Sequence, residues 1–159
     1  MKSPKTSRFW GISRLLTAVL AVVIAVGCSP GQARPDTASA QLDHEFVLAG
    51  GQSAVIDGSA VDTAPLRLKF ERVLDDSRCP KRVSCVWTGA AHIAVIATLD
   101  GQQPTTLEFN TNPAPGQTHL TEAVGGYTVE LRSLDPYPET PGTIGLEDYR
   151  ATMLVVRAN

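Results

Sequence analysis

From residue 42 onward, hydrophobic and polar residues alternate along the chain in short runs. The clearest runs cover residues 66–71, 92–99, 106–110, 127–132 and 149–156. Successive side chains of a strand point to opposite faces, so a period of two is typical of a strand with one buried face. No stretch of useful length after residue 42 shows the 3.6-residue period of a helix. The pattern predicts seven to nine short strands.

Glycine and proline separate these runs. Asp100-Gly101 can supply the positive φ of a two-residue type I′ hairpin turn, and Gly50-Gly51 and Gly125-Gly126 predict similar turns. Three prolines within 136–141 predict one long loop before the last strand. Short strands joined by such turns predict an all-β fold, an antiparallel β-sandwich of the immunoglobulin-like kind. A small β-barrel is the second architecture.

A different pattern marks the first 28 residues. Basic residues at positions 2, 5, 8 and 14 give a charge of +4 without any acidic residue, and an apolar run follows from Leu15 to Val26. At 1.5 Å per residue this run is roughly 18 Å long as a helix, whereas a bilayer core is about 30 Å thick. A basic start, a short apolar run and small residues at its end are typical of a secretory signal.

The end of this run, Ala25-Val26-Gly27-Cys28, resembles the bacterial lipobox, although Ala25 stands where Leu is usual. The resemblance implies that residues 1–27 are a signal peptide that is removed and that Cys28 is lipidated. An ordinary signal with a chance cysteine and a short anchor helix are the alternatives. In a Gram-negative cell, Ser29 after the cysteine, in place of Asp, implies sorting to the outer membrane.

These features divide the chain into three parts. After the signal peptide, residues 28–41 contain no apolar side chain larger than Ala apart from the lipid site, which predicts a flexible tether. Residues 42–159 then form a single β-sandwich domain. The expected location is the bacterial cell envelope, with the membrane as one partner through the anchor on Cys28.

The charge and composition exclude two classes of protein. The chain from Cys28 holds 16 acidic and 10 basic residues, a net charge of −6. A nucleic-acid binder needs a clustered basic face, so we expect no nucleic-acid partner. With 43% hydrophobic residues the chain can bury a core, which excludes a wholly disordered protein.

The two remaining cysteines, Cys79 and Cys85, are close enough in sequence to close a small loop. In an exported protein a disulfide is their expected state. A metal centre would need more thiolates or a nearby histidine pair, and the three histidines lie on separate segments. The sequence therefore predicts no metal and no cofactor.

Residues 75–80 and 83–91 around these cysteines read DDSRCP and VSCVWTGAA. They resemble a family of small, largely uncharacterised bacterial secreted proteins and lipoproteins, which carry Asp-Ser-Arg-Cys-Pro, a second cysteine six residues on and then Trp-x-Gly. Many members also end in a segment like residues 148–156, and Arg82 stands where relatives often have Gly. The resemblance spans residues 46–156 and implies no established activity.

Physical roles follow for the residues around the cysteines. We expect Arg78 to pair with Asp76 or its neighbour Asp75 and to fix the approach to the loop, as an exposed pair contributing about 0–1 kcal/mol. Trp87, two residues after Cys85, is expected to cover the disulfide. Gly89 is expected to turn the chain into the next strand. These structural roles are favoured over an active site.

The sequence contains no recognisable catalytic set. Gly-x-Ser-x-Gly, His-Glu-x-x-His and phosphate-binding glycine loops are absent, and adjacent carboxylates such as Asp75-Asp76 and Glu147-Asp148 would point in opposite directions on a strand. We therefore predict no enzyme, but a binding or interaction module whose partner is an unknown envelope protein or glycan.

Three alternatives to a binding module stay open. The disulfide loop holds Pro80, Lys81 and Arg82, which would suit a protease inhibitor that presents a basic residue on a rigid loop. An enzyme whose site assembles only in space and a purely structural envelope protein are the others.

Overall fold

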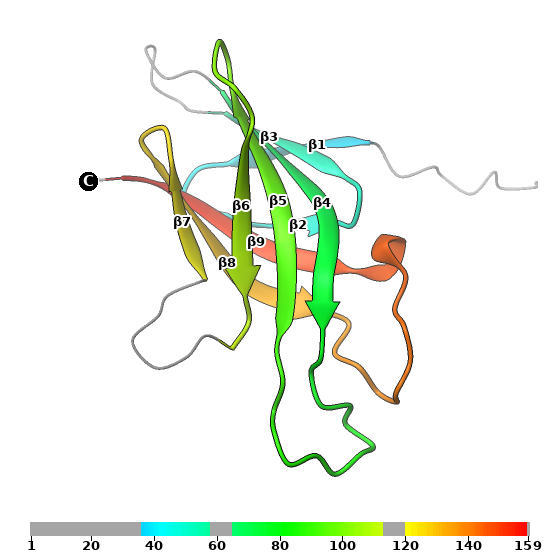
Figure 1. Cartoon of the computed structure of the whole chain (residues 1–159). Helices are drawn as coiled ribbons and strands as arrows, with labels where there is room; N and C mark the ends of the chain where they lie inside the picture. The colour runs from blue at the N-terminus through cyan, green and yellow to red at the C-terminus, as the bar shows by residue number, and fades with distance from the viewer. Residues whose placement is uncertain (1–35, 58–64, 113–119, 159) are drawn as a thin grey trace, which may run out of the picture. The chain divides into compact units, whose positions relative to one another are not determined.

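The computed structural model describes residues 36–57, 65–112 and 120–158. In these ranges nine strands form two sheets (Figure 1). The five-stranded sheet has the order β1 (Thr37–Gln41), β3 (Ser53–Asp57), β4 (Leu66–Asp76), β5 (Ala91–Leu99) and β6 (Thr105–Asn110). The four-stranded sheet has the order β2 (Glu45–Ala49), β9 (Arg150–Arg157), β8 (Tyr127–Asp135) and β7 (Thr121–Val124). One short 3-10 helix, η1 (Leu146–Asp148), precedes β9.

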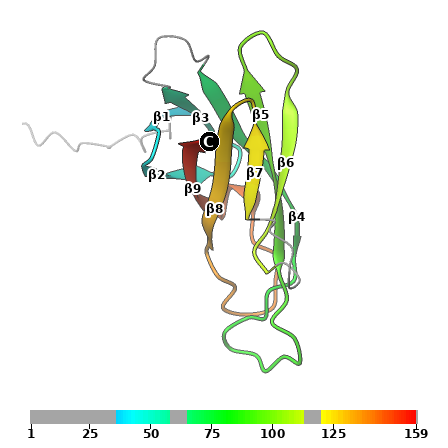
Figure 2. The same cartoon turned by 90° about the vertical axis from the view of Figure 1, so that its left-hand side faces the viewer.

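The predicted β-sandwich is confirmed, because the two sheets lie as separate layers (Figure 2) and, over the described residues, do not close into a barrel. Strands β3 to β6 follow one another as an antiparallel meander within one sheet. The second sheet contains the meander β7 to β9, with β2 added beside β9. This strand order differs from that of immunoglobulin domains, in which strand B lies beside E and strand C beside F, because most neighbouring strands here are consecutive in the sequence.

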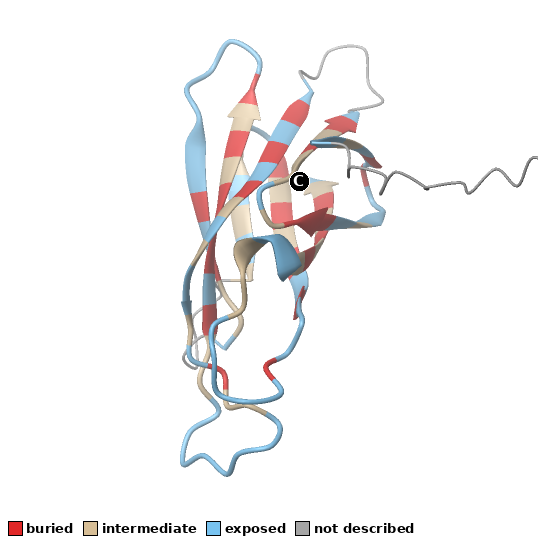
Figure 3. Ribbon diagram, turned by 90° about the vertical axis from the view of Figure 1, so that its right-hand side faces the viewer, coloured by how far each residue is buried: buried red, intermediate tan, exposed pale blue. Residues whose placement is uncertain are grey.

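The core between the sheets is built by the alternating residues. On β4, Leu66, Leu68 and Phe70 are fully buried, while Arg67 and Lys69 between them are exposed. The same alternation on the other strands gives the banded colouring of Figure 3. Burying each large apolar side chain contributes about 1.5–3 kcal/mol to the stability of the fold. The apolar residues that predicted the strands therefore also supply most of the stabilisation.

Of the three predicted two-residue hairpin turns, the structure contains one. Gly125-Gly126 joins β7 to β8 as a two-residue turn, with φ of 49° and 81° as type I′ requires. Asp100-Gly101 instead begins a longer loop, because β6 starts only at Thr105. Gly50-Gly51 connects β2 to β3, which lie in different sheets, so it is no hairpin turn.

The first strand corrects the predicted extent of the tether. Thr37–Gln41, expected to belong to a flexible tether ending at residue 41, pairs in parallel with β3, and Ala40 is buried. An edge strand is held by backbone hydrogen bonds, and side chains as small as Ala suffice to pack it onto the core. The sandwich therefore begins before residue 42. Cys28 and the rest of the predicted signal and tether up to residue 35 lie outside the described residues.

Two long loops leave the sandwich at one end. β4 ends at Asp76 beside the start of β5, and β8 ends at Asp135 beside the start of β9. The loop 77–90, which we call the disulfide loop, and the loop 136–145, which we call the proline loop, both begin there (Figure 1). No helix within the described ranges is long and apolar enough to span a membrane.

Candidate functional site

A disulfide and two backbone hydrogen bonds hold the two sides of the disulfide loop together. Cys79 and Cys85 form the predicted disulfide, with their Cα atoms 6.0 Å apart. The backbone N–H of Ser77 donates to the carbonyl of Ala90 (2.8 Å), and that of Cys79 donates to the carbonyl of Thr88 (2.9 Å). The ladder between β4 and β5 thus continues into the loop, and the disulfide then limits the motion of the remaining residues.

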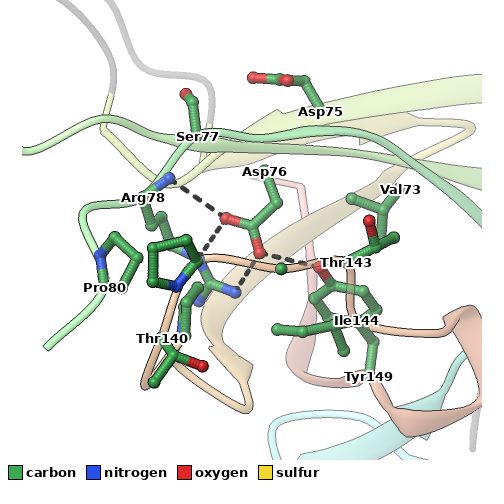
Figure 4. A pocket seen from close by; sticks show the side chains of 13 residues that line it. Val73, Asp75, Asp76, Ser77, Arg78, Pro80, Thr140, Thr143, Ile144 and Tyr149 are labelled. Carbon is green, nitrogen blue, oxygen red and sulfur yellow. Dashed lines mark hydrogen bonds and ion pairs between the residues drawn. The ribbon is translucent and has the colours of Figure 1, made fainter. Parts of the chain in front are cut away.

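A buried ion pair joins the disulfide loop to the proline loop (Figure 4). Arg78 binds Asp76 through two hydrogen bonds, Nε to Oδ1 (2.8 Å) and Nη2 to Oδ2 (2.7 Å). The same guanidinium donates through Nη1 to the carbonyl of Leu134 (2.7 Å) and through Nη2 to that of Pro136 (3.0 Å). Tyr149 donates its hydroxyl to Asp76 Oδ2 (2.8 Å). One side chain therefore fixes two loops.

The predicted pairing of Arg78 is confirmed, but its expected exposure is wrong. The side chains of Arg78 and Asp76 are only 6% and 10% exposed. The proline loop, which contacts Arg78 through a carbonyl and a tyrosine ring, lies over the pair. Asp75 does not take part, since its side chain is exposed and points away from Asp76 in Figure 4. Charge-assisted bidentate bonds in such a place are much stronger than a surface pair.

The hydrogen bonds keep both members of the pair ionised. Burial by itself raises the pKa of the Asp76 carboxyl, but the bonds from Arg78 and Tyr149 outweigh it, so this pKa lies below its usual value. Burial likewise acts to lower the pKa of Arg78, and the bond to Asp76 reverses the effect and raises it. Burial and the bond to Asp76 together raise the pKa of Tyr149 to about 12.

The raised pKa of Tyr149 predicts a loss of stability in alkali. An unfolded tyrosine has a pKa near 10, so the folded chain holds this proton more tightly, and the contribution is complete below pH 10 and lost as the pH rises towards 12. Tyr149→Phe should lower the free energy of unfolding by about 1–3 kcal/mol at pH 8. The difference from the natural chain should shrink above pH 10 in denaturant titrations. A difference independent of pH would contradict this, and Tyr137→Phe, at an exposed tyrosine, is the control.

The basic residues of the disulfide loop lie in a turn against the proline loop. The N–H groups of Lys81 and Arg82 donate to the carbonyls of Pro138 (3.0 Å) and Glu139 (3.1 Å). Lys81 Nζ lies 2.6 Å from Glu139 Oε1, and Arg82 Nε lies 3.8 Å from Glu139 Oε2. An inhibitor that adds to a protease as an extended strand needs free main-chain groups. With Pro80 to Arg82 folded and bonded in this way, the geometry does not favour the inhibitor alternative.

Trp87 does not cover the disulfide, because the loop around it is not a strand and the residue is 81% exposed. Val86 is 90% exposed and Val83 40% exposed. We call Val83, Val86 and Trp87 the apolar tip. Tyr137, the aromatic residue of the proline loop, lies under the cations of Arg78 and Lys81, 5.1 and 6.0 Å from its ring centroid. These four residues are most of the large hydrophobic side chains that the described residues expose.

Gly89 has the predicted role of turning the chain into β5. Its φ is +66°, and a Cβ atom there would lie 1.8 Å from the carbonyl oxygen of Ser77. Only glycine lets the two sides of the loop approach so closely. Asn112 Nδ2 then donates to Thr88 Oγ1 (2.8 Å) and to the carbonyl of Gly89 (3.1 Å), which fixes the turn from the side of β6.

Two hollows lie on either side of Arg78. One, of about 340 Å³, is lined by Asp76, Tyr149 and residues of the proline loop (Figure 4). The other, of about 460 Å³, is lined by Leu131, Leu134 and Tyr137 among others. Asp76 and Tyr149 of the first hollow already bond one another, which makes these two groups poor candidates for a general acid or base.

The described residues contain no cluster of three or more histidine, cysteine or acidic side chains that could hold a metal ion. His44 and His92 are both exposed, and His119 lies outside the described residues. Every buried side-chain nitrogen or oxygen in the described ranges has a hydrogen-bond partner. The candidate interaction surface is therefore the exposed apolar tip.

The sequence did not reveal three members of this site: Tyr137, Glu139 and Tyr149. Tyr149 bonds a residue 73 positions away, and Glu139 one 58 positions away. Tyr149 belongs to an alternating strand run, and that pattern marks its buried ring but carries no information about the partner of its hydroxyl.

Comparisons of the chain with protein-family models, with curated proteins and with solved structures find no match.

Proposed function

We propose that the protein is a tethered recognition module of the bacterial cell envelope that binds its target through the apolar tip. The observation that carries this proposal is the gathering of Val83, Val86 and Trp87 on one loop, with the last two almost fully exposed. Contiguous apolar side chains on a protein surface mark interaction sites, and tryptophan is among the residues that contribute most to binding.

The support beneath the tip fits a binding surface. The disulfide, the continued β4–β5 ladder and the bonds to the proline loop hold the loop in one conformation. The buried pair of Arg78 and Asp76 fixes its base. A loop that is ordered before binding loses little conformational entropy when it meets a target. A loop of purely structural function has no need to expose Trp87.

The same arrangement supports a non-enzymatic role. The titratable side chains at the loop end that have perturbed pKa values, Asp76, Arg78 and Tyr149, bind one another in a closed set. A catalytic acid or base must reach a substrate, and these groups are committed to holding the loops.

The anchor belongs to the proposal as well, and it rests on the sequence around Cys28. Nine peptide steps separate Cys28 from Thr37, the first residue of β1, and span at most about 30 Å. Thr37 pairs with Ser53, and Ser53 with Lys69, seven residues before the end of β4. At about 3.3 Å per residue, β1 thus begins roughly 23 Å from the loop end. The tip projects from the end of the sandwich beyond this distance.

Site-specific photocrosslinking in intact cells tests the proposal. A photoreactive amino acid at Val86 should give crosslinked products with an envelope protein or with lipid. The matched control is the same amino acid at Val47, which is also apolar and 53% exposed but lies on β2. Cys28→Ser, which removes the thiol for lipidation, should release the protein from the membrane and abolish these products. Equal labelling from both positions, or none from Val86, would contradict the proposal.

A further inference from the structure

The apolar tip is small. It consists of two residues adjacent in sequence, Val86 and Trp87, that are 90% and 81% exposed, and of Val83 on the same loop, which is 40% exposed. A stable protein–protein interface buries about 800 Å² on each partner, more than such a tip supplies. A lipid-anchored protein needs much less, because the anchor already keeps it at high local concentration near the bilayer. The size of the tip therefore fits a membrane better than a protein groove.

The charges around the tip also suit a membrane. The disulfide loop contains three basic residues and no acidic residue, although the chain as a whole carries more acid than base. Arg78 is neutralised by Asp76, and Lys81 by Glu139, while the side chain of Arg82 is 75% exposed and 3.8 Å from Glu139. An anionic leaflet attracts the exposed base and repels the acidic remainder of the chain, which favours approach by the disulfide loop.

The chemistry of the tip distinguishes lipid from glycan. Tryptophan is enriched at the boundary between headgroups and acyl chains, where its ring is buried and its N–H stays near water. The residues beside Trp87 in the tip are valines, which can enter the same region. Sugar recognition would instead need polar side chains placed around the ring.

We infer that the apolar tip inserts Val86 and Trp87 into the interfacial region of an anionic phospholipid membrane. This inference rests on the proposed function, since it names the target of the same surface. The tether allows contact with the membrane that holds the anchor when the sandwich tilts, because tilting brings the start of β1 nearer to the membrane surface and the tether spans up to about 30 Å. The protein would then be held at two points, by its lipid and by its tip.

Quenching of Trp87 fluorescence by brominated phospholipid tests the inference. The full chain, processed in cells, is reconstituted in vesicles of phosphatidylglycerol and phosphatidylethanolamine with bromine on the acyl chains. Trp87 is the single tryptophan reporter of the processed chain, because Trp10 lies in the predicted signal peptide. We expect a blue shift and quenching of its emission. Arg82→Gln should reduce both in these vesicles, as should replacing the lipids by zwitterionic phosphatidylcholine.

Three variants make the test specific to the tip. Val86→Ser keeps the reporter and should lower the ratio of inserted to free tips at least about tenfold, whereas Val47→Ser should not change it. Placing the reporter on β2 instead, by Val47→Trp with Trp87→Phe, should give unquenched emission. Circular dichroism of each variant checks that the sandwich is intact.

Emission of Trp87 that is neither shifted nor quenched in anionic vesicles would overturn the membrane inference. If photocrosslinks from Val86 to one envelope protein accompany that result, the tip is a protein-binding surface and the proposed function stands. If position 86 gives no crosslinks either, the proposed function fails together with the inference.

Discussion

Replacing Arg78 by methionine is expected to lower the free energy of unfolding by about 3–5 kcal/mol, measured in denaturant titrations. Methionine keeps much of the length of the side chain but removes every donor. Asp76 would then be left 10% exposed without its counter-ion, and the carbonyls of Leu134 and Pro136 would lose their partner. A small domain has only about 5–15 kcal/mol of stability in total, so this single change removes a large part of it.

Three comparisons separate the buried pair from general damage. Lys69→Met removes an ion pair with Glu71 whose side chains are 46% and 37% exposed, and should cost about 1 kcal/mol or less. Arg78→Lys keeps the charge but not the two parallel bonds, so it should lie between the natural chain and the methionine variant. Adding Asp76→Asn to Arg78→Met should restore part of the stability, because no uncompensated charge is then buried.

The pH dependence gives a further readout of the same pair. The pKa of Asp76 is lowered in the folded chain, so its contribution is present above the unfolded value of about 3.9 and is lost as the pH falls through the lower folded value. In Arg78→Met the carboxyl can protonate at little cost. The difference in stability between the two proteins should therefore shrink below about pH 4. A difference that stays constant down to pH 3 would show that lost packing, not the ion pair, is responsible.

The strands and the sandwich were predictable because they depend on local alternation. The buried faces of β4 and β8 follow from the alternation of apolar and polar residues within each strand, which does not depend on the strand beside it. The disulfide followed from spacing and from the expected compartment. The start of the sandwich was not predictable from composition, since β1 is held by backbone bonds to β3 and needs no large side chain.

The two wrong predictions at the site, the exposure of Arg78 and the burial of Trp87 against the disulfide, have a common physical reason. Arg78 was expected on the surface because its immediate neighbours are polar, and its burial depends on a loop that lies more than 50 residues further along the chain. Trp87 was expected to share a face with Cys85 because side chains two apart do so on a strand. The disulfide loop is irregular there, so that rule does not apply. Long-range loop packing therefore decides the exposure of both residues.

After Arg78→Met, the largest loss of stability is expected from the added methyl group of Gly89→Ala. Gly89→Ala combines a left-handed φ of +66° with a Cβ atom 1.8 Å from the Ser77 carbonyl oxygen, a backbone atom that cannot simply rotate away.

We expect Gly89→Ala to lower the free energy of unfolding by about 2–5 kcal/mol, the sum of the left-handed cost and of an overpacked contact. The matched control is Gly101→Ala, at a φ of +76° with no atom within 4 Å of the added Cβ, which should cost only about 1–2 kcal/mol. Denaturant titrations of the two variants side by side measure the difference. Equal costs would contradict the close approach of Gly89 to Ser77. A larger cost at Gly89, together with weaker crosslinking from Val86, would show that this contact at the base of the disulfide loop also sets the position of the apolar tip.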